Sequence, residues 1–211
     1  ALVKALNDLY QWNLGTKELS ILARLGSGSA SRSLEHGFVE WVAGTQEDGS
    51  DSYATGLKAD WPDFRIGILT LSTESKPVGS TEGMRRTMET SALYASWPAE
   101  VDRALPLIRQ AVLDQDFPAL GAAAEQNALS MHATMIASWP PILYWKPETL
   151  QILHRVQALR SEGVEVYATL DAGPNVKVMF TVKDQETLSE AFPGLQVVSP
   201  FEPTPHLRRR N

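Results

Sequence analysis

Residues 26–34, with the sequence GSGSASRSL, carry the groups best suited to bind an anion. Glycines at positions 26 and 28 let the backbone turn tightly and approach a ligand, and the interleaved serine hydroxyls can donate hydrogen bonds to phosphate oxygens. Arg32 adds a planar guanidinium that suits a phosphate or a carboxylate. We therefore predict that this cradle segment binds phosphate. A flexible Gly/Ser linker is the alternative, which the apolar residues on both flanks disfavour.

Two residues further along the chain could complete such a site. Ser80 begins a predicted helix, whose free N–H groups favour an anion, although plain helix capping is an equal alternative. Asp171 follows the alternating strand 164–170, on the side of its polar residues. A carboxylate with an ordinary pKa of about 3.9 is ionised at neutral pH and can accept a proton. The alternative for Asp171 is a residue that starts a hairpin turn.

Three other polar residues have a structural interpretation. His132 lies between apolar neighbours, which favours a core or cleft-lining residue over a catalytic base. Asp48 and Asp51 belong to the sequence DGSDS, which lacks the length and the terminal Glu of a calcium loop. We interpret it as a turn and predict no metal ligands in this chain.

The composition is that of a globular protein and restricts its partners. The chain has 211 residues, of which 43% are hydrophobic and 21% charged. Its net charge of −6 argues against a nucleic-acid partner, and no apolar run approaches the roughly 20 residues of a membrane span. The absence of cysteine excludes disulfides and fits a cytoplasmic protein. Positive residues nevertheless lie in or beside the candidate motifs: Arg24, Arg32, Lys76, Arg85 and Arg86.

Periodicity and turn residues predict an α+β chain. Helices are expected at 1–14, 16–25, from 80, 98–114, 117–138, 147–163 and 184–192. Strands are expected at 38–42, 64–71, 164–170, 175–182 and 195–198, with a polar loop at 44–56. From residue 61 onward the order resembles β-α-β-β-α-β, which is the ferredoxin-like pattern. Proline and a basic end predict a tail at 200–211.

Five motifs in order resemble the mevalonate diphosphate decarboxylases of the GHMP kinase superfamily: RLGSGSASRSL at 24–34, GFVEW at 37–41, DGSDS at 48–52, GSTEGM at 79–84 and DAGPN at 171–175. The resemblance implies the C-terminal part of a GHMP-kinase fold. Residues 1–60 would be the remainder of a ribosomal-protein-S5-like domain, and 61–199 a ferredoxin-like α/β sandwich. The family's ATP loop would precede Ala1, so we expect this chain alone to be inactive.

The resemblance also implies a reaction. Mevalonate 5-diphosphate would be decarboxylated with ATP and Mg²⁺ to isopentenyl diphosphate, phosphate and carbon dioxide, by a cytoplasmic homodimer without nucleic-acid or membrane partners. By resemblance, Asp171 would orient the tertiary hydroxyl and accept its proton, and Arg32 would hold the departing carboxylate. The residues that would bind the substrate are Ser27, Gly28, Ser29, Arg32 and Ser80. The alternatives are a mevalonate monophosphate decarboxylase, a mevalonate kinase, or a non-catalytic truncated fragment that binds the substrate.

Overall fold

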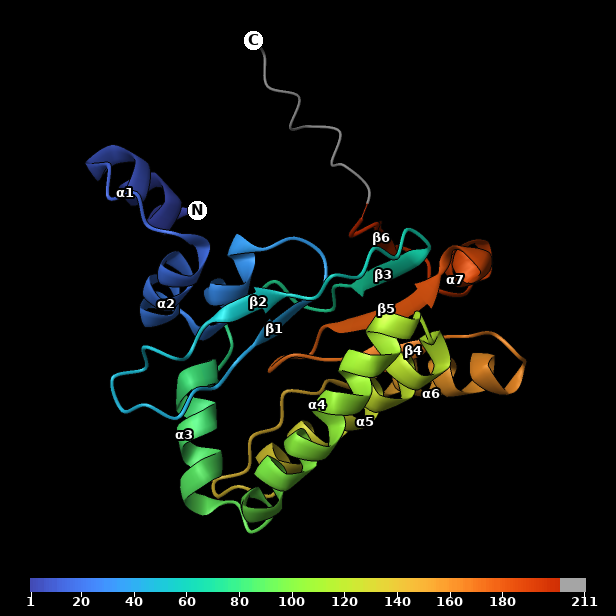
Figure 1. Cartoon of the computed structure of the whole chain (residues 1–211). Coiled ribbons are helices and arrows are strands. Elements are labelled where there is room, and N and C mark those ends of the chain that lie inside the picture. The colour runs from blue at the N-terminus through green and yellow to red at the C-terminus, as the bar shows by residue number, and fades with distance from the viewer. Residues whose placement is uncertain (202–211) are drawn as a thin grey trace. The chain divides into compact units, whose positions relative to one another are not determined.

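A computed structural model describes residues 1–201 of the chain (Figure 1). The chain divides into two compact units, Ala1–Asp60 and Trp61–Asn211, which we call the N-terminal and C-terminal units. Each contains both helices and strands, which confirms the α+β prediction. No helix among the described residues combines the length and apolar character needed to cross a bilayer. The predicted tail lies outside the described residues from position 202 onward.

The N-terminal unit consists of three helices and a small sheet. Helices α1 (Leu2–Tyr10) and α2 (Thr16–Gly26) precede the 3-10 helix η1 (Gly28–Leu34), and β1 (Val39–Trp41) pairs antiparallel with β2 (Ala54–Gly56). The predicted first helix is too long, because Gln11 adopts a left-handed conformation (φ 51°) and ends α1 there. Strand β2 was also missed, since three residues carry no periodic signal.

The C-terminal unit is built on a four-stranded antiparallel sheet with the order β4-β5-β3-β6. Its strands are β3 (Phe64–Leu69), β4 (Tyr167–Thr169), β5 (Val176–Thr181) and β6 (Gln196–Val198). Its helices are α3 (Ser80–Thr90), η2 (Tyr94–Ser96), α4 (Trp97–Asp114), α5 (Phe117–Ile136), α6 (Pro147–Ser161), η3 (Val182–Asp184) and α7 (Gln185–Ala191). The order of elements along the chain, with α3 to α6 between β3 and β4 and α7 between β5 and β6, follows the β-α-β-β-α-β pattern that the sequence predicts.

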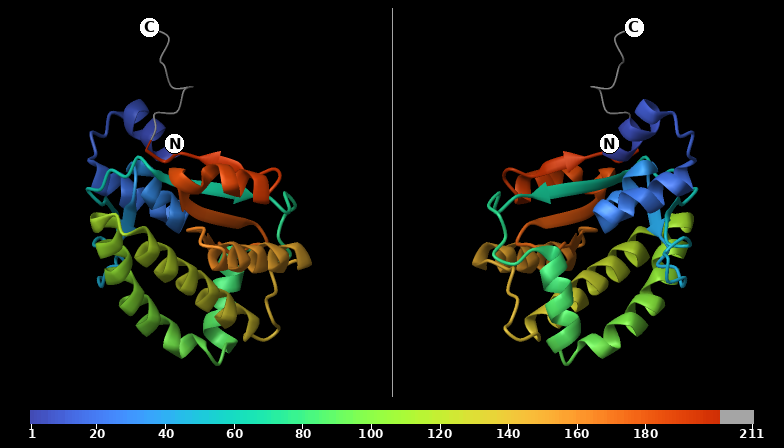
Figure 2. Two further views of the ribbon diagram at one scale, coloured as in Figure 1. Left: turned by 90° about the vertical axis from the view of Figure 1, so that its right-hand side faces the viewer. Right: turned by 90° about the vertical axis from the view of Figure 1, so that its left-hand side faces the viewer.

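The core of this unit lies between the sheet and the helices. Helices α4 and α5 run side by side (Figure 2), and α5 and α6 pack against β4. The apolar face predicted for β5 is confirmed at Val176, Val178 and Phe180, which are fully buried. It does not extend to Val182, which is exposed because the chain has already turned into η3. Gly121 lets α5 approach β4, since a Cβ there would lie 2.1 Å from the Tyr167 ring.

Candidate functional site

The cradle segment is an ordered helical turn whose inner side is tied to the N-terminal unit. Ser31 is fully buried, and its hydroxyl donates to the Gly28 carbonyl at 2.7 Å. The Ser20 hydroxyl donates to the Ser31 carbonyl at 3.2 Å and accepts from the Ala54 amide at 2.8 Å. One buried serine on α2 thus joins the cradle segment to β2, which contradicts the flexible-linker alternative.

Glycine at position 28 is required by packing. A Cβ at Gly28 would lie 2.7 Å from the Trp41 ring, whereas one at Gly26 would meet nothing within 4 Å. The Trp41 indole nitrogen in turn donates to the Ser52 hydroxyl at 3.1 Å. The absence of a side chain at Gly28 therefore allows η1 to pack against β1, in addition to any approach of a ligand.

The outer side of the cradle segment presents polar groups to solvent. Ser27, Ser29 and Arg32 are exposed, and the hydroxyls of Ser27 and Ser29 lie 3.2 Å apart. Arg24 instead contacts the loop that precedes β2, because its guanidinium donates to the Gly49 carbonyl at 3.1 Å. Of the two arginines in this motif, Arg32 is thus the one that is directed to solvent.

The loop with two aspartates is a turn, as predicted. The Asp51 carboxylate accepts hydrogen bonds from the backbone amides of Thr45 (2.7 Å) and Gln46 (3.1 Å). The Asp48 carboxylate accepts from the Ser50 amide at 2.9 Å. These backbone hydrogen bonds lower the pKa of both carboxyls.

In the C-terminal unit, the segment 171–175 is held at three points. The His132 Nε2–H donates to the Asp171 carbonyl at 3.2 Å, and the buried Thr149 hydroxyl donates to the Pro174 carbonyl at 2.8 Å. The Asn175 side chain accepts from the amides of Leu71 (2.8 Å) and Ser72 (2.9 Å). This segment is thus held by side chains of two helices and by backbone amides just after β3, so it is well suited to carry a positioned functional group.

The Asp171 carboxylate itself extends away from these anchors. Its side chain is 86% exposed and forms an ion pair with Lys177 on β5. An ion pair whose carboxylate is this exposed contributes little to stability. The carboxylate is therefore accessible to a substrate, while its backbone is fixed by His132.

Ser80 occupies the first turn of α3, but it is not the cap. Gly79 is the N-cap residue, and no side chain caps the helix. The Lys76 ammonium lies 3.3 Å from the Ser80 hydroxyl and 4.0 Å from the position that a Cβ on Gly173 would take. Ser80 and Ala172 also line one cavity of about 440 Å³. The structure thus brings Ser80, Lys76 and the segment after Asp171 together.

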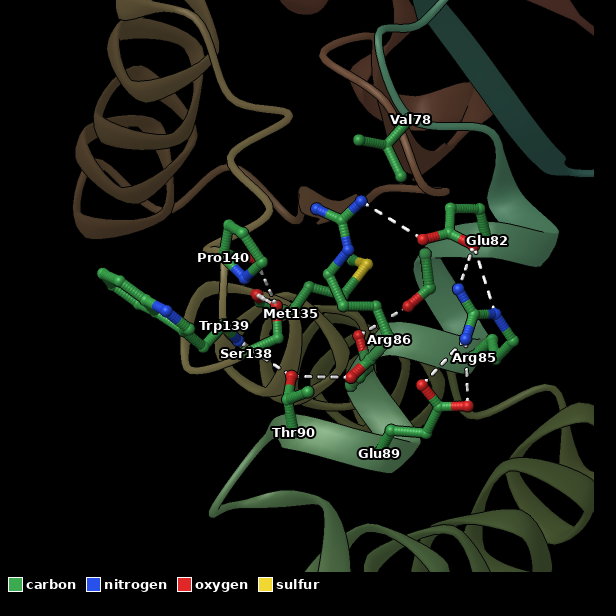
Figure 3. A network of polar contacts seen from close by, with 12 residues as sticks. Val78, Glu82, Arg85, Arg86, Glu89, Thr90, Met135, Ser138, Trp139 and Pro140 are labelled. Atoms are coloured by element: carbon green, nitrogen blue, oxygen red, sulfur yellow. Dashed lines mark hydrogen bonds and ion pairs between the residues drawn. The ribbon is translucent and has the colours of Figure 1, made fainter.

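The two arginines that follow Ser80 are neutralised by acidic neighbours on the same helix. Arg85 pairs with Glu82 (2.8 Å) and Glu89 (2.9 Å), and Arg86 pairs with Glu82 at 3.2 Å (Figure 3). At its other end α3 is tethered by Thr90, whose hydroxyl accepts from the Trp139 amide at 2.8 Å. Lys76, in contrast, places its ammonium within hydrogen-bonding distance of the Ser80 hydroxyl.

His132 is a buried residue, as predicted, and burial lowers its pKa below the ordinary 6.5. A histidine that is neutral when folded but protonated when unfolded costs stability as the pH falls. We expect the free energy of unfolding to decrease as the pH is lowered below 6.5, and to decrease less in His132→Gln. Urea unfolding between pH 8 and pH 5 measures this. The exposed His154→Gln is the control, and an unchanged pH dependence in His132→Gln would contradict the prediction.

Sequence reasoning gave no role to Lys177, Thr149 or Tyr144, and mentioned Lys76 only as a nearby charge. Lys177 was detectable in principle, because it lies on the hairpin strand that follows Asp171. Thr149 and Tyr144 act through contacts with residues far away in the sequence. Nothing in their local pattern indicates those contacts.

Two family models match the chain. Residues 66–202 match the mevalonate 5-diphosphate decarboxylase C-terminal domain, and residues 1–54 match the diphosphomevalonate decarboxylase-like N-terminal domain. The diphosphomevalonate decarboxylase of Aspergillus fumigatus is 41% identical over 195 residues, which cover 90% of this chain and 48% of that protein. The chain thus spans about half the length of the curated relatives it matches.

Solved structures agree with these matches. A structure described as MDDEF in complex with MVAPP, AMPPCP and magnesium superposes with a TM-score of 0.87 at 39% identity, covering 93% of this chain and 62% of that one. A mevalonate diphosphate decarboxylase from Enterococcus faecalis gives a TM-score of 0.86 at 38% identity, covering 93% and 61%. The fold predicted from the sequence motifs is therefore confirmed.

Proposed function

Because this chain belongs to the mevalonate 5-diphosphate decarboxylase family, we propose that the protein converts mevalonate 5-diphosphate and ATP to isopentenyl diphosphate, ADP, phosphate and carbon dioxide. The observation that carries the proposal is the ordered match of both family models, over 1–54 and 66–202. A similar structure binds MVAPP together with AMPPCP and magnesium, which supports the same substrates here.

The C-terminal unit would supply the proton acceptor. Phosphoryl transfer depends mainly on positioning and on stabilising charge, so a carboxylate need only orient the tertiary hydroxyl and accept its proton. Asp171 suits this role, because its carboxylate is exposed while its backbone is anchored. Ser80, at the free amino end of α3 and beside Lys76, would donate to the diphosphate of the substrate.

The N-terminal unit would bind the anionic groups of the substrate. The exposed hydroxyls of Ser27 and Ser29 and the backbone at Gly28 would hold the diphosphate. Arg32 would form two parallel hydrogen bonds to the substrate carboxylate, which later leaves as carbon dioxide. The hydrogen bonds of Ser31 and Ser20 tie this segment to α2 and β2, which supports a preformed site.

Magnesium ligands are not assigned to this chain. Among residues 1–201, no three or more His, Cys, Asp or Glu side chains gather where they could hold a metal ion. ATP would act as the phosphate donor and magnesium would accompany it, as AMPPCP and magnesium do in the similar structure.

We also propose that the protein acts in the cytoplasm as a homodimer. The proposal follows from family membership and agrees with the lack of cysteine. Light scattering on the protein as encoded by its complete gene measures the assembly state, and a monomer at assay concentrations would contradict the dimer.

The activity is tested with the protein as encoded by its complete gene. It is incubated with ATP and magnesium and, in parallel, with mevalonate 5-diphosphate, mevalonate 5-phosphate or mevalonate. We expect equal amounts of carbon dioxide and phosphate, and kcat/KM highest for the diphosphate. Consumption of ATP without carbon dioxide would instead indicate a kinase. Preference for the monophosphate would indicate the related decarboxylase.

A further inference from the structure

Two buried side chains next to the proposed proton acceptor have polar atoms directed at backbone carbonyls. The first is His132 on α5, which is 1% exposed and donates to the carbonyl of Asp171 at 3.2 Å. Its ring contacts two aromatic side chains, with its centroid 5.1 Å from that of Trp145 and 6.4 Å from that of Tyr144. The imidazole therefore has a fixed orientation relative to Asp171.

The second is Tyr144, whose ring meets the His132 ring edge-on at 90°. Its hydroxyl donates to the Val78 carbonyl at 3.0 Å, two residues before Ser80. Helix α3 passes close to this hydroxyl, since a Cβ on Gly83 would lie 2.8 Å from it. Tyr144 thus fixes the start of α3 in the way that His132 fixes Asp171.

Apolar packing connects the same two segments. Tyr144, Met135 and Ile142 form a buried cluster, and Val78 and Ala172 both pack against it. Val78 precedes Ser80, and Ala172 follows Asp171. One cluster therefore contacts a residue within two positions of each proposed site residue in the C-terminal unit.

We propose that His132 and Tyr144 are positioning residues, which together hold the Asp171 carboxylate at a set place relative to the first turn of α3. This inference rests on the proposed function, because it assumes that Asp171 accepts the proton and that Ser80 binds substrate. A displacement of about 1 Å between reacting groups lowers rates by as much as about a hundredfold. If the two rings served only to fill space, their polar atoms would need no particular partners. Instead, His132 hydrogen-bonds to the Asp171 carbonyl and Tyr144 to the Val78 carbonyl.

The test uses Tyr144→Phe, His132→Leu and His132→Gln in the protein as encoded by its complete gene. Tyr144→Phe keeps the ring and removes the bond to Val78, and His132→Gln can keep a donor to Asp171. We expect kcat to fall about fivefold in Tyr144→Phe and at least about tenfold in His132→Leu, with KM within about threefold. His132→Gln should recover most of the rate lost in His132→Leu.

The controls are His154→Gln, at an exposed position of α6, and Tyr10→Phe, at an exposed position of α1, together with melting temperatures for all variants. Tyr144→Phe decides the question if His132→Leu does not fold. The inference is wrong if Tyr144→Phe retains kcat within twofold, or if His132→Gln is as slow as a folded His132→Leu. Asp171→Asn and the wild type are measured alongside. An unchanged rate in Asp171→Asn would show that Asp171 is not the proton acceptor, and no release of carbon dioxide by the wild type would show that the proposed function has failed instead.

Discussion

Asp171→Asn lowers kcat by at least about a hundredfold, the scale of general base catalysis, and changes KM by no more than a few fold. The amide has the shape of the carboxylate, so the contacts that hold the substrate remain. It cannot accept a proton from the hydroxyl under attack, however, so the loss occurs in the chemical step. Steady-state kinetics with mevalonate 5-diphosphate and saturating ATP measure both parameters.

Asp102→Asn is the matched control, because it removes a solvent-exposed carboxylate from α4 in the same unit. The melting temperature of Asp171→Asn should stay close to that of the wild type, since the carboxylate that pairs with Lys177 is exposed. A kcat within threefold of the wild type would show that Asp171 is only a turn residue. That result would remove the central residue of the proposed mechanism.

Arg32→Lys is the second large effect, with an expected fall in kcat of about ten- to a hundredfold. A guanidinium donates two parallel hydrogen bonds to a carboxylate, whereas an ammonium is a point charge on a flexible stem. One lost hydrogen bond to a charged group costs about 1.5–3 kcal/mol. Since orientation matters most as the leaving groups separate, kcat should fall more than the substrate affinity.

Arg103→Lys is the control for this substitution, because Arg103 is an exposed arginine whose partner is Glu100 on its own helix. Lysine can replace arginine there without functional loss. Arg32 is also exposed, so Arg32→Lys should not change the melting temperature. If kcat and KM in Arg32→Lys both equal those of the wild type, Arg32 is a solvated charge and the cradle segment does not bind the carboxylate through it.

Local patterns determined most of the secondary structure, because they depend on neighbours within a turn or a strand. Alternation placed Val166, Ala168 and Leu170 on one face, and all three are buried. The helix starts expected near Asp116 and Pro147 are confirmed, with the Asp116 side chain accepting from the Ala119 amide. The five ordered motifs likewise identified the family, which the comparisons confirm.

The same local reasoning failed where one residue or a distant partner decides the outcome. Helix α1 ends at the left-handed Gln11 rather than at Gly15, and the predicted Ser80 cap is Gly79. The charge expected near Ser80 from Arg85 and Arg86 is neutralised by Glu82 and Glu89, because residues three and four apart share a helix face. That outcome could have been read from the spacing.

What surrounds the candidate site was decided by the tertiary structure alone. The hydrogen bond from His132 to Asp171 joins residues 39 apart in sequence, and the one from Tyr144 to Val78 joins residues 66 apart. Such contacts exist only after α5, α6 and the sheet have packed, so no periodicity or turn signal encodes them. The sequence by itself determined which residues could perform the chemistry. Packing determined which of them are held by a buried donor, as Asp171 is, and which are exposed, as Arg32 is.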